Sequence, residues 1–248
     1  MLIPVHELSL NYRITPRGVL HVGAHLAEEE EEYLSHNWDV GSKIYWVESQ
    51  PELVNQLNKK INRQRSEVIQ STAWSSNDVE LTLKITSNSQ SSSLYSFGTH
   101  ESDYPEIKVV NEIKVTTERL DRSLAGKIFD FVNIDIQGAE LEALKGLGDL
   151  LNQTKWIYLE INKKNVYEGC ASVLEIDEFL KSKQFTRVET RWILFKGWGD
   201  AIYIRNNILE DLTLKLYLIK LRETKFYIRE FTKLTKFKIK KLVVFLSK

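Results

Sequence analysis

The sequence predicts an α/β fold of the doubly wound type, with a mostly parallel sheet and a late antiparallel hairpin. Two observations lead to this class. Short apolar stretches rich in β-forming residues alternate with stretches of helical character, which is typical of parallel βαβ units. Later, two apolar stretches are joined by a short connection that contains Gly197 and Gly199, which favours a hairpin. The 248 residues suffice for one sizeable domain with an appendage.

The first half of the chain shows the alternation most regularly. Strands are expected at residues 18–22, 43–48, 68–73 and 79–85. Helices are expected at residues 27–37 and 52–61. The first helix has acidic residues in its first turn, where the helix dipole favours them. Pro51 stands at the start of the second helix, a position that suits proline.

The second half continues the pattern after a long polar stretch. Residues 86–106, rich in serine and asparagine at their start, are expected to form a long loop, which in a compact domain is usually functional or disordered. Strands are expected at residues 109–117, 129–134, 156–161, 187–195 and 201–205. Helices are expected at residues 139–150 and 173–182. The two last strands are those of the hairpin.

Composition narrows the class of protein. Apolar residues make up 42% and charged residues 27%, as in ordinary soluble proteins. The single cysteine, Cys170, excludes an internal disulfide and a cysteine-based zinc site, so a cytoplasmic setting is expected. We expect no secretory signal and no membrane span. No metal is expected either, because the one dense acidic run, residues 28–32, is interpreted as a solvated helix face.

The formal net charge of zero hides an asymmetry. Residues 205–248 contain 12 basic and 4 acidic residues, so the rest of the chain is acidic. We therefore predict two units, a domain at residues 1–205 and a basic helical tail at 206–248. In the tail, lysines lie between apolar residues spaced by three, namely Ile228, Phe231, Leu234 and Phe237. A basic amphipathic helix suits an anionic membrane surface or a partner protein.

Other interpretations of the tail stay open. The helix could pack on its own domain or on a second subunit. Nucleic-acid binding is a weaker option, because basic charge alone is unspecific. The expected location is therefore the cytoplasm, with peripheral attachment to a membrane as one alternative.

Two turns after the first strands carry candidate ligand-binding residues. Gly23 follows the first strand, where the backbone must bend sharply and come close to a ligand. A dinucleotide fingerprint needs three glycines, and only this one is present, so NAD binding is not supported. Glu48 ends the second strand, where a carboxylate can hold ribose hydroxyls. The plainer alternatives are a glycine that any such turn favours and a glutamate at the surface.

The most informative segment follows the strand at residues 129–134. That strand runs directly into Asp135, and the turn Gln137-Gly138 then opens a helix. This arrangement places a carboxylate at the carboxyl edge of a sheet, where open α/β folds bind ligands. The structural alternative is that Asp135 caps the helix.

The segment at residues 135–146 resembles the hallmark of FkbM-type methyltransferases. That family commonly shows Asp-Val-Glu-Gly-Ala-Glu, then leucines and a Lys-Gly pair, and here Gln137 replaces the usual second acidic residue. Weaker similarities lie at Glu48 and at residues 91–94, 117–121, 158–162 and 198–201. The resemblance covers about residues 18–205. It implies a Rossmann-like class I fold that uses S-adenosyl-L-methionine and methylates a hydroxyl of a glycan or glycosylated product.

The resemblance also implies roles for single residues. The first turn would approach the methionine part of the cofactor, Glu48 its ribose, and the end of the third strand its adenine. The implied cofactor-binding residues are His21, Gly23, Ala24, Glu48, Ser49, Ala73, Trp74 and Asp135. Glu160 and Asn162 would face the acceptor. Candidates for the base that takes the acceptor proton are Asp135, Glu160 and His25.

Two rival functions remain on the sequence alone. His21, His25 and Gln137 all depart from the usual pattern, which would suit a non-catalytic module that keeps the fold and docks through its tail. A nucleotide-binding enzyme of another kind, such as a dehydrogenase, is the second rival, and the missing glycines argue against it.

Overall fold

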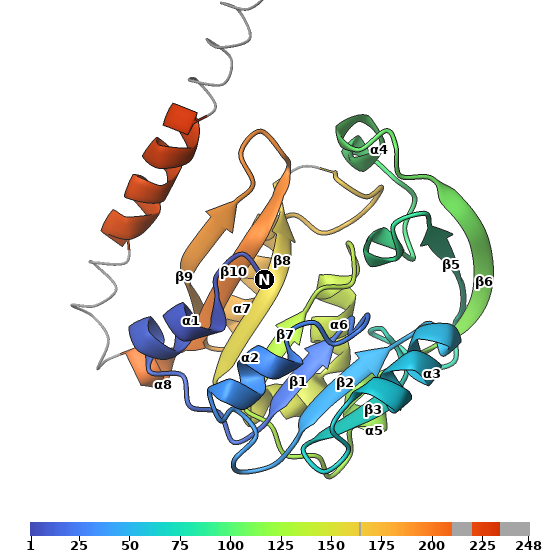
Figure 1. Ribbon diagram of the computed structural model, residues 1–248, viewed down its shortest axis with the longest axis horizontal. Helices are drawn as coiled ribbons and strands as arrows, with labels where there is room; N and C mark the ends of the chain where they lie inside the picture. The colour runs from blue at the N-terminus through green and yellow to red at the C-terminus, as the bar shows by residue number, and fades with distance from the viewer. Residues whose placement is uncertain (164, 210–219, 234–248) are drawn as a thin grey trace, which may run out of the picture.

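The computed structural model describes residues 1–163, 165–209 and 220–233, and its centre is a seven-stranded sheet (Figure 1). The strand order is β3-β2-β1-β7-β8-β10-β9. The strands are β1 (Val19–Val22), β2 (Ile44–Glu48), β3 (Ser66–Gln70), β7 (Phe131–Ile134), β8 (Trp156–Asn162), β9 (Phe185–Trp192) and β10 (Trp198–Arg205). Strand β10 runs antiparallel to both neighbours, and the other pairs are parallel. The predicted fold class and hairpin are confirmed.

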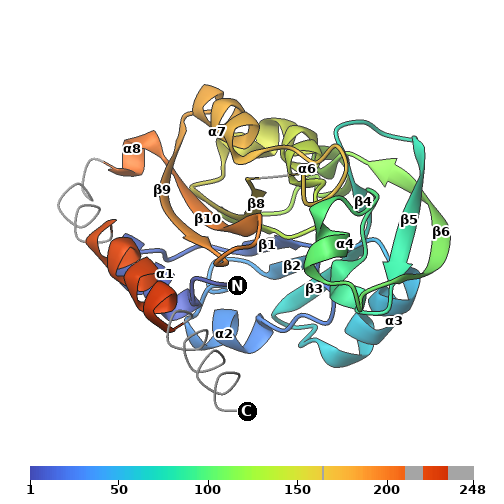
Figure 2. The same cartoon turned by 90° about the horizontal axis from the view of Figure 1, so that it is seen from above.

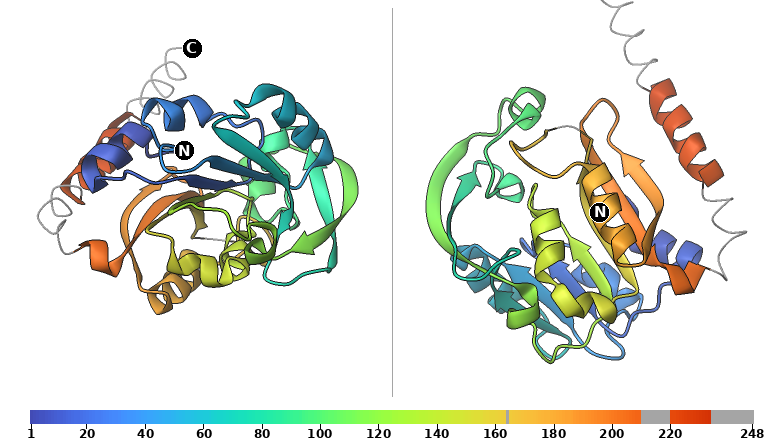
Figure 3. Two further views of the ribbon diagram at one scale, coloured as in Figure 1. Left: turned by 90° about the horizontal axis from the view of Figure 1, so that it is seen from below. Right: turned by 180° about the vertical axis from the view of Figure 1, so that it is seen from behind.

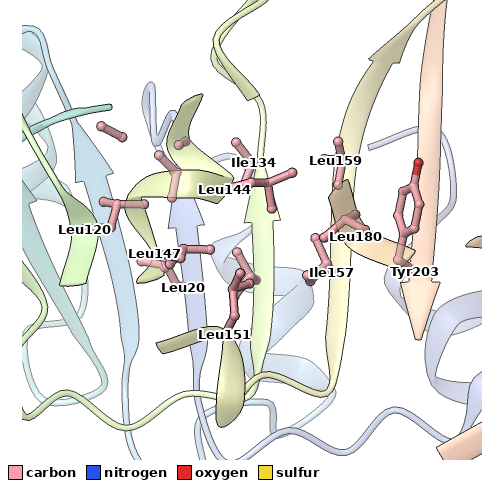
Figure 4. Close-up of a cluster of buried hydrophobic side chains, with 14 of the residues drawn as sticks. Leu20, Leu120, Ile134, Leu144, Leu147, Leu151, Ile157, Leu159, Leu180 and Tyr203 are labelled. Atoms are coloured by element: carbon pink, nitrogen blue, oxygen red, sulfur yellow. The ribbon is translucent and has the colours of Figure 1, made fainter. Parts of the chain in front are cut away.

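Helices cover both faces of the sheet, so the fold is doubly wound (Figure 2). One face packs against α1 (Val5–Tyr12), α2 (Glu30–Ser35) and α3 (Pro51–Lys60). The other face packs against α5 (Leu120–Ser123), α6 (Glu140–Gly146) and α7 (Val173–Ser182). Figure 3 shows the two layers from below and from behind. Each face has its own apolar core, and Figure 4 shows the one beneath α6 and α7.

The central strands are buried along their whole length. Every residue of β1, β7 and β8 is buried, as expected for strands covered by helices on both faces. Chain order reverses between β1 and β7, because the chain runs from β1 outward to β3 and then returns. Such a switch point leaves a crevice at the carboxyl ends of the strands. The site described below lies in this crevice.

A small second sheet stands beside the main one. It contains β4 (Thr72–Ala73), β6 (Val109–Glu118) and β5 (Glu80–Thr86), in this order. The strand predicted at residues 68–73 is therefore wrong as one element: it divides at Ser71, and its second part pairs with β6. The expected loop at residues 86–106 contains a 3-10 turn, η1 (Ser89–Ser91), and a short helix, α4 (Thr99–Asp103).

Backbone geometry explains other differences at element ends. The helix expected at residue 27 begins only at Glu30, because His25 and Ala27 both have positive φ angles. The helix expected at residues 139–150 ends at Gly146 and continues as a 3-10 turn, η2 (Gly148–Asn152). Helix α1 has no counterpart in the sequence prediction. Its apolar residues are too few to signal a helix without the sheet that they cover.

Part of the predicted tail packs on the domain itself. After α8 (Asn206–Leu209), residues 220–233 form a helix beside β9 (Figure 1). The Trp192 N–H donates to the Tyr227 hydroxyl over 2.7 Å, and the Thr190 N–H donates to the Glu223 carboxylate. For these residues, the alternative that the tail helix packs on its own domain applies. Leu234 and Phe237 lie outside the described residues.

No helix among the described residues is long and apolar enough to cross a membrane.

Candidate active site

Two adjoining cavities occupy the crevice at the carboxyl ends of β1, β2 and β7. The narrower cavity lies between the ends of β1 and β2 and the small sheet, and Val47, Glu48, Ala73 and Leu83 are among its walls. The larger cavity, of about 560 Å³, lies over β8 and β10. Both cavities share five lining residues, namely Gly23, His25, Gln90, Asp135 and Gln137. A group held in one cavity can therefore meet a group held in the other at Asp135.

Gly23 is required by the backbone of the protein itself. It has φ +90°, and a Cβ atom there would lie 1.8 Å from the Asp135 carbonyl oxygen. The Asp135 N–H donates to the Val22 carbonyl over 2.9 Å, which fixes the two turns against each other. The sequence correctly indicated a close approach at Gly23. Its closest neighbour within the protein is the turn after β7, and the approach to a ligand stays a prediction.

Glu48 is buried at the wall of the narrower cavity. Its carboxylate accepts the N–H of His25 over 3.0 Å and that of Gln50 over 2.8 Å. Burial raises its pKa, although these backbone donors oppose the shift. Next to it, the Ser49 hydroxyl lies 2.6 Å from the Thr72 hydroxyl. A surface glutamate is thus excluded, and the carboxylate faces the cavity where a ribose would need it.

Asp135 is open to both cavities and does not cap α6. Instead, Glu140 braces the turn: its carboxylate accepts the N–H groups of Ile136 over 3.2 Å and of Gly138 over 3.0 Å. The protein surrounding Asp135 raises the pKa of its carboxyl to about 6, and the nearby Asp200 adds to this shift. At neutral pH an ionised carboxylate therefore stands at the junction of the cavities.

Gln137 holds Asp135 in place. Its side-chain N–H donates to Asp135 Oδ1 over 2.6 Å, and the Tyr167 hydroxyl donates to its amide oxygen. The Ser93 hydroxyl donates to the Gln137 carbonyl over 2.6 Å. A glutamate at this position would place a second carboxylate against Asp135. The residue that departs from the usual motif thus supplies a donor at the centre of the site.

The sequence model of the methyltransferase FkbM domain matches residues 21–186, which is more than half of the chain. The chain belongs to the FkbM methyltransferase family. The recognition and the cofactor expected from the motif, S-adenosylmethionine, are therefore confirmed. The dehydrogenase alternative is excluded.

Relatives of known structure or name are distant. The chain is 35% identical over 86 residues to the 2-O-methyltransferase NoeI of Sinorhizobium fredii, a match that covers 34% of this chain and 35% of NoeI. The FkbM methyltransferase structure from Methylobacillus flagellatus matches 75% of this chain and 43% of that chain, at 14% identity and a TM-score of 0.48. The structure of a methyltransferase from Aquifex aeolicus matches 75% of this chain and 81% of that chain, at 18% identity and a TM-score of 0.41.

The residues present in this FkbM methyltransferase fit S-adenosylmethionine. The narrower cavity combines the Glu48 carboxylate with apolar side chains, among them Leu53, Leu83 and Leu94, as a ribose and an adenine require. Asp135 offers a carboxylate where a cationic sulfonium would be stabilised. The three leucines were not predicted as site residues, and Leu94 belongs to a segment at which the family similarity pointed.

Not every predicted cofactor residue lines this cavity. Ala73 does, together with Ser71 and Thr72, but Trp74 lines neither cavity. The reason is the split strand: the Trp74 N–H donates to the Glu118 carbonyl of β6, and its indole packs 6.1 Å from the Tyr95 ring. The structure therefore does not bring Trp74 to the wall of either cavity.

The two off-pattern histidines are held by neighbours. His21 is buried, its ring lies 4.8 Å from that of Trp46, and burial lowers its pKa, so it is neutral. It lines the larger cavity with Ala24. Both ring nitrogens of His25 are engaged, one with Glu28 at 2.6 Å and one with the Ser89 hydroxyl at 2.7 Å.

The two residues predicted to face the acceptor, Glu160 and Asn162, lie in different surroundings. Glu160 lines the larger cavity. Burial and the nearby carboxylates of Asp135, Glu140 and Asp200 raise its pKa well above the ordinary value. Asn162 is fully buried opposite Trp198 and lines neither cavity, so the structure does not bring it together with Glu160 at the cavity wall.

Several cavity residues were not predicted. Glu28 and Glu29 line the larger cavity, and the buried Glu30 accepts a hydrogen bond from the Ser66 hydroxyl over 2.6 Å, so the acidic run is not merely a solvated helix face. Tyr167 and Asp200 also line this cavity. Asp200 belongs to a segment that resembled the family, whereas no sequence signal marked Tyr167.

Among the described residues, no group of three or more His, Cys, Asp or Glu side chains is arranged to hold a metal ion.

Proposed function

We propose that this protein transfers a methyl group from S-adenosylmethionine to a hydroxyl of a glycan or glycosylated product. The observation that carries the proposal is the position of Asp135 at the junction of two cavities. One cavity fits the cofactor, and the other is large enough for a sugar. The methyl group and the acceptor oxygen would therefore meet beside a carboxylate.

S-adenosylmethionine, when bound, supplies an electrophilic methyl group, and the protein must align the acceptor and take its proton. Glu48 holds the ribose in this proposal. Gln137 occupies one oxygen of Asp135, which orients the carboxylate and leaves the other oxygen for the acceptor. Alignment in a confined site supplies much of the acceleration for such a transfer.

Asp135 is the best-placed base among the three candidates. Its pKa of about 6 leaves it ionised at neutral pH and close enough to that pH to accept a proton. His25 is less suited, because both of its ring nitrogens already have partners. Glu160 lines only the larger cavity, so we assign it to acceptor binding.

The larger cavity supports a sugar acceptor. Tyr104, Tyr167 and Trp198 offer aromatic surface, and several carboxylates offer hydrogen-bond acceptors for hydroxyl groups. The named function of NoeI, a 2-O-methyltransferase, agrees with transfer to oxygen. Because the match spans only about a third of each protein, the acceptor of NoeI is not carried over.

Two measurements test the proposed function. Calorimetry with S-adenosylhomocysteine should detect binding, and absence of binding at millimolar ligand would contradict the proposal. Transfer of a tritiated methyl group should then be measured on a panel of neutral, amino and acidic oligosaccharides. Binding of the cofactor without transfer to any of them would favour the non-catalytic alternative.

We also propose that the helix at residues 220–233 attaches the protein to anionic membranes. Ile228 is 62% exposed, and Lys225 and Arg229 are exposed beside it. Anionic vesicles should co-sediment the full chain, and the double variant Lys225→Glu, Arg229→Glu should stay in solution. Equal sedimentation of both proteins would contradict the proposed attachment to membranes. Neither substitution touches Glu223 or Tyr227, so the helix keeps its contacts with β9.

A further inference from the structure

Two carboxylates face each other across neighbouring strands in the larger cavity. Glu160 on β8 and Asp200 on β10 are direct partners in the antiparallel register. Side chains of such partners lie on the same face of the sheet with Cβ atoms about 5 Å apart. Both residues are at least nine-tenths buried, and both line the cavity. Like charges directly opposite each other destabilise a sheet.

Glu160 has nothing in the described part of the chain to offset its charge. Asp200 accepts the Leu2 N–H over 2.7 Å and the Tyr158 hydroxyl. Glu160 makes no hydrogen bond and no ion pair with any described residue, although its side chain is 94% buried by its surroundings. Buried charges in proteins are normally paired. Among the described residues nothing pairs with the Glu160 carboxylate, so a group that enters the cavity can bind it.

Carboxylates dominate the wall of the cavity, and the cation among its described lining residues is the Met1 amino group, which interacts with Asp200 and Glu29. Its lining carboxylates are Glu28, Glu29, Glu106, Asp135, Glu160 and Asp200. No lysine or arginine side chain is part of this lining. The nearest cationic groups are already engaged: the Met1 amino group lies 3.5 Å from Glu29, and the Lys196 ammonium binds Asp103 at 3.3 Å. An acceptor with a phosphate or carboxylate would meet repulsion here.

The position of the pair separates it from the cofactor. The sulfonium belongs beside Asp135, at the end of β7. Strand β8, which carries Glu160, is next to β7, and β10, which carries Asp200, is two places away, which corresponds to about 5 and 10 Å. The pair therefore lies on the acceptor's side of the junction, near the aromatic rings of Tyr167 and Trp198.

We infer that Glu160 and Asp200 bind an ammonium group of the acceptor, so that the acceptor is an amino sugar with a free amine. This inference rests on the proposed function and names the substrate class of the same site. A sugar ammonium has three N–H donors, which suit a carboxylate without a partner on one side and a partly satisfied carboxylate on the other. Its hydroxyl would then point back toward Asp135.

The test compares three monosaccharides, of which one is cationic, one is neutral and one is anionic. Calorimetry with the full chain, in the presence of saturating S-adenosylhomocysteine, would titrate glucosamine, N-acetylglucosamine and glucuronic acid. We expect glucosamine to bind about tenfold tighter than its acetylated form, and glucuronic acid not to bind. Binding of glucosamine no tighter than the other two, including no binding of any sugar, overturns the inference.

Variants decide whether the preference comes from this pair. Glu160→Gln keeps the shape of the side chain and should abolish the preference for glucosamine. Glu178→Gln, which removes one exposed carboxylate on α7, is the matched control and should keep it. A preference that survives Glu160→Gln, or a magnesium ion that binds the pair and excludes glucosamine, would also overturn the inference. Failure of S-adenosylhomocysteine to bind would instead count against the proposed function.

Discussion

The two halves of the cleft differ in how completely their polar groups are satisfied. On the cofactor's side, Glu48 and Glu140 each accept two backbone N–H groups, and Gln137 holds Asp135. On the acceptor's side, Glu160 has no partner among the described residues, and neither has the Nδ1 atom of His100. The first half is organised before any ligand binds. The second half has polar groups whose partners must come from the ligand.

The largest effect is expected from a substitution of Asp135, which lies at the centre of the cofactor's side. Asp135→Asn keeps the shape of the side chain and removes its ability to take a proton. Methyl transfer to the best acceptor of the panel should fall about 10²–10⁴-fold, the usual contribution of a general base. Binding of S-adenosylhomocysteine should change little, because it has no sulfonium charge. Transfer within a few-fold of the original rate would show that Asp135 is not the base.

Stability should respond oppositely in the two halves. Glu140→Ala leaves the N–H groups of Ile136 and Gly138 without their acceptor, so the free energy of unfolding should fall by about 2 kcal/mol at pH 5, where the raised pKa of Glu140, about 7, costs little. Glu160→Ala removes a carboxylate whose folded-state pKa is raised, and whose ionised form therefore costs stability at pH 8. It should leave the unfolding free energy unchanged or higher.

The pH dependence of stability tests the direction of the effect expected for Glu160→Ala. A raised pKa in the folded state means that the cost of Glu160 shrinks as the pH falls below that pKa and is gone near the ordinary value of 4.5. Urea unfolding of the unliganded protein at pH 8 and pH 5 should therefore show a benefit of Glu160→Ala only at the higher pH. A loss of unfolding free energy in Glu160→Ala at pH 8, as large as the loss expected for Glu140→Ala, would contradict the difference between the two halves.

A smaller effect is expected from Gln137→Glu. A carboxylate would then stand where the amide now donates to Asp135 over 2.6 Å, and its charge should raise the pKa of Asp135 above about 6. Because the base acts when ionised, the acidic limb of the pH–rate profile should move to higher pH by about one unit. Tyr167→Phe, which keeps the amide, should leave that limb in place. An unmoved limb in Gln137→Glu would show that the amide does not govern Asp135.

Much of the fold could be predicted because local signals and burial agree. Strands such as β1, β7 and β8 are covered on both faces, so their sequences are continuous apolar runs. The division of the third predicted strand at Ser71 is not marked by any comparable pattern in the sequence. Both pieces are β-forming, and only the pairing of Thr72–Ala73 with β6 separates them.

The candidate site was predictable mainly on its cofactor side, and on the acceptor's side only Glu160 was predicted. Gly23, Glu48 and Asp135 follow strands directly, so the topology of a parallel sheet brings them together. Tyr167 enters the site from a loop, and Asp200 enters from an antiparallel strand two places away from β7. Their positions depend on tertiary contacts that no local pattern encodes. Asn162 shows the converse: it ends a strand as expected, yet it is fully buried and lines neither cavity.

The helix at residues 220–233 has a consequence for the behaviour of the protein in solution. Strand β9 is the last strand of the sheet, and an uncovered last strand offers its N–H groups to any other extended chain. Glu223 and Tyr227 accept two of these N–H groups, those of Thr190 and Trp192. The helix therefore stops the sheet from growing by self-association. Removing it should produce a protein that aggregates through β9.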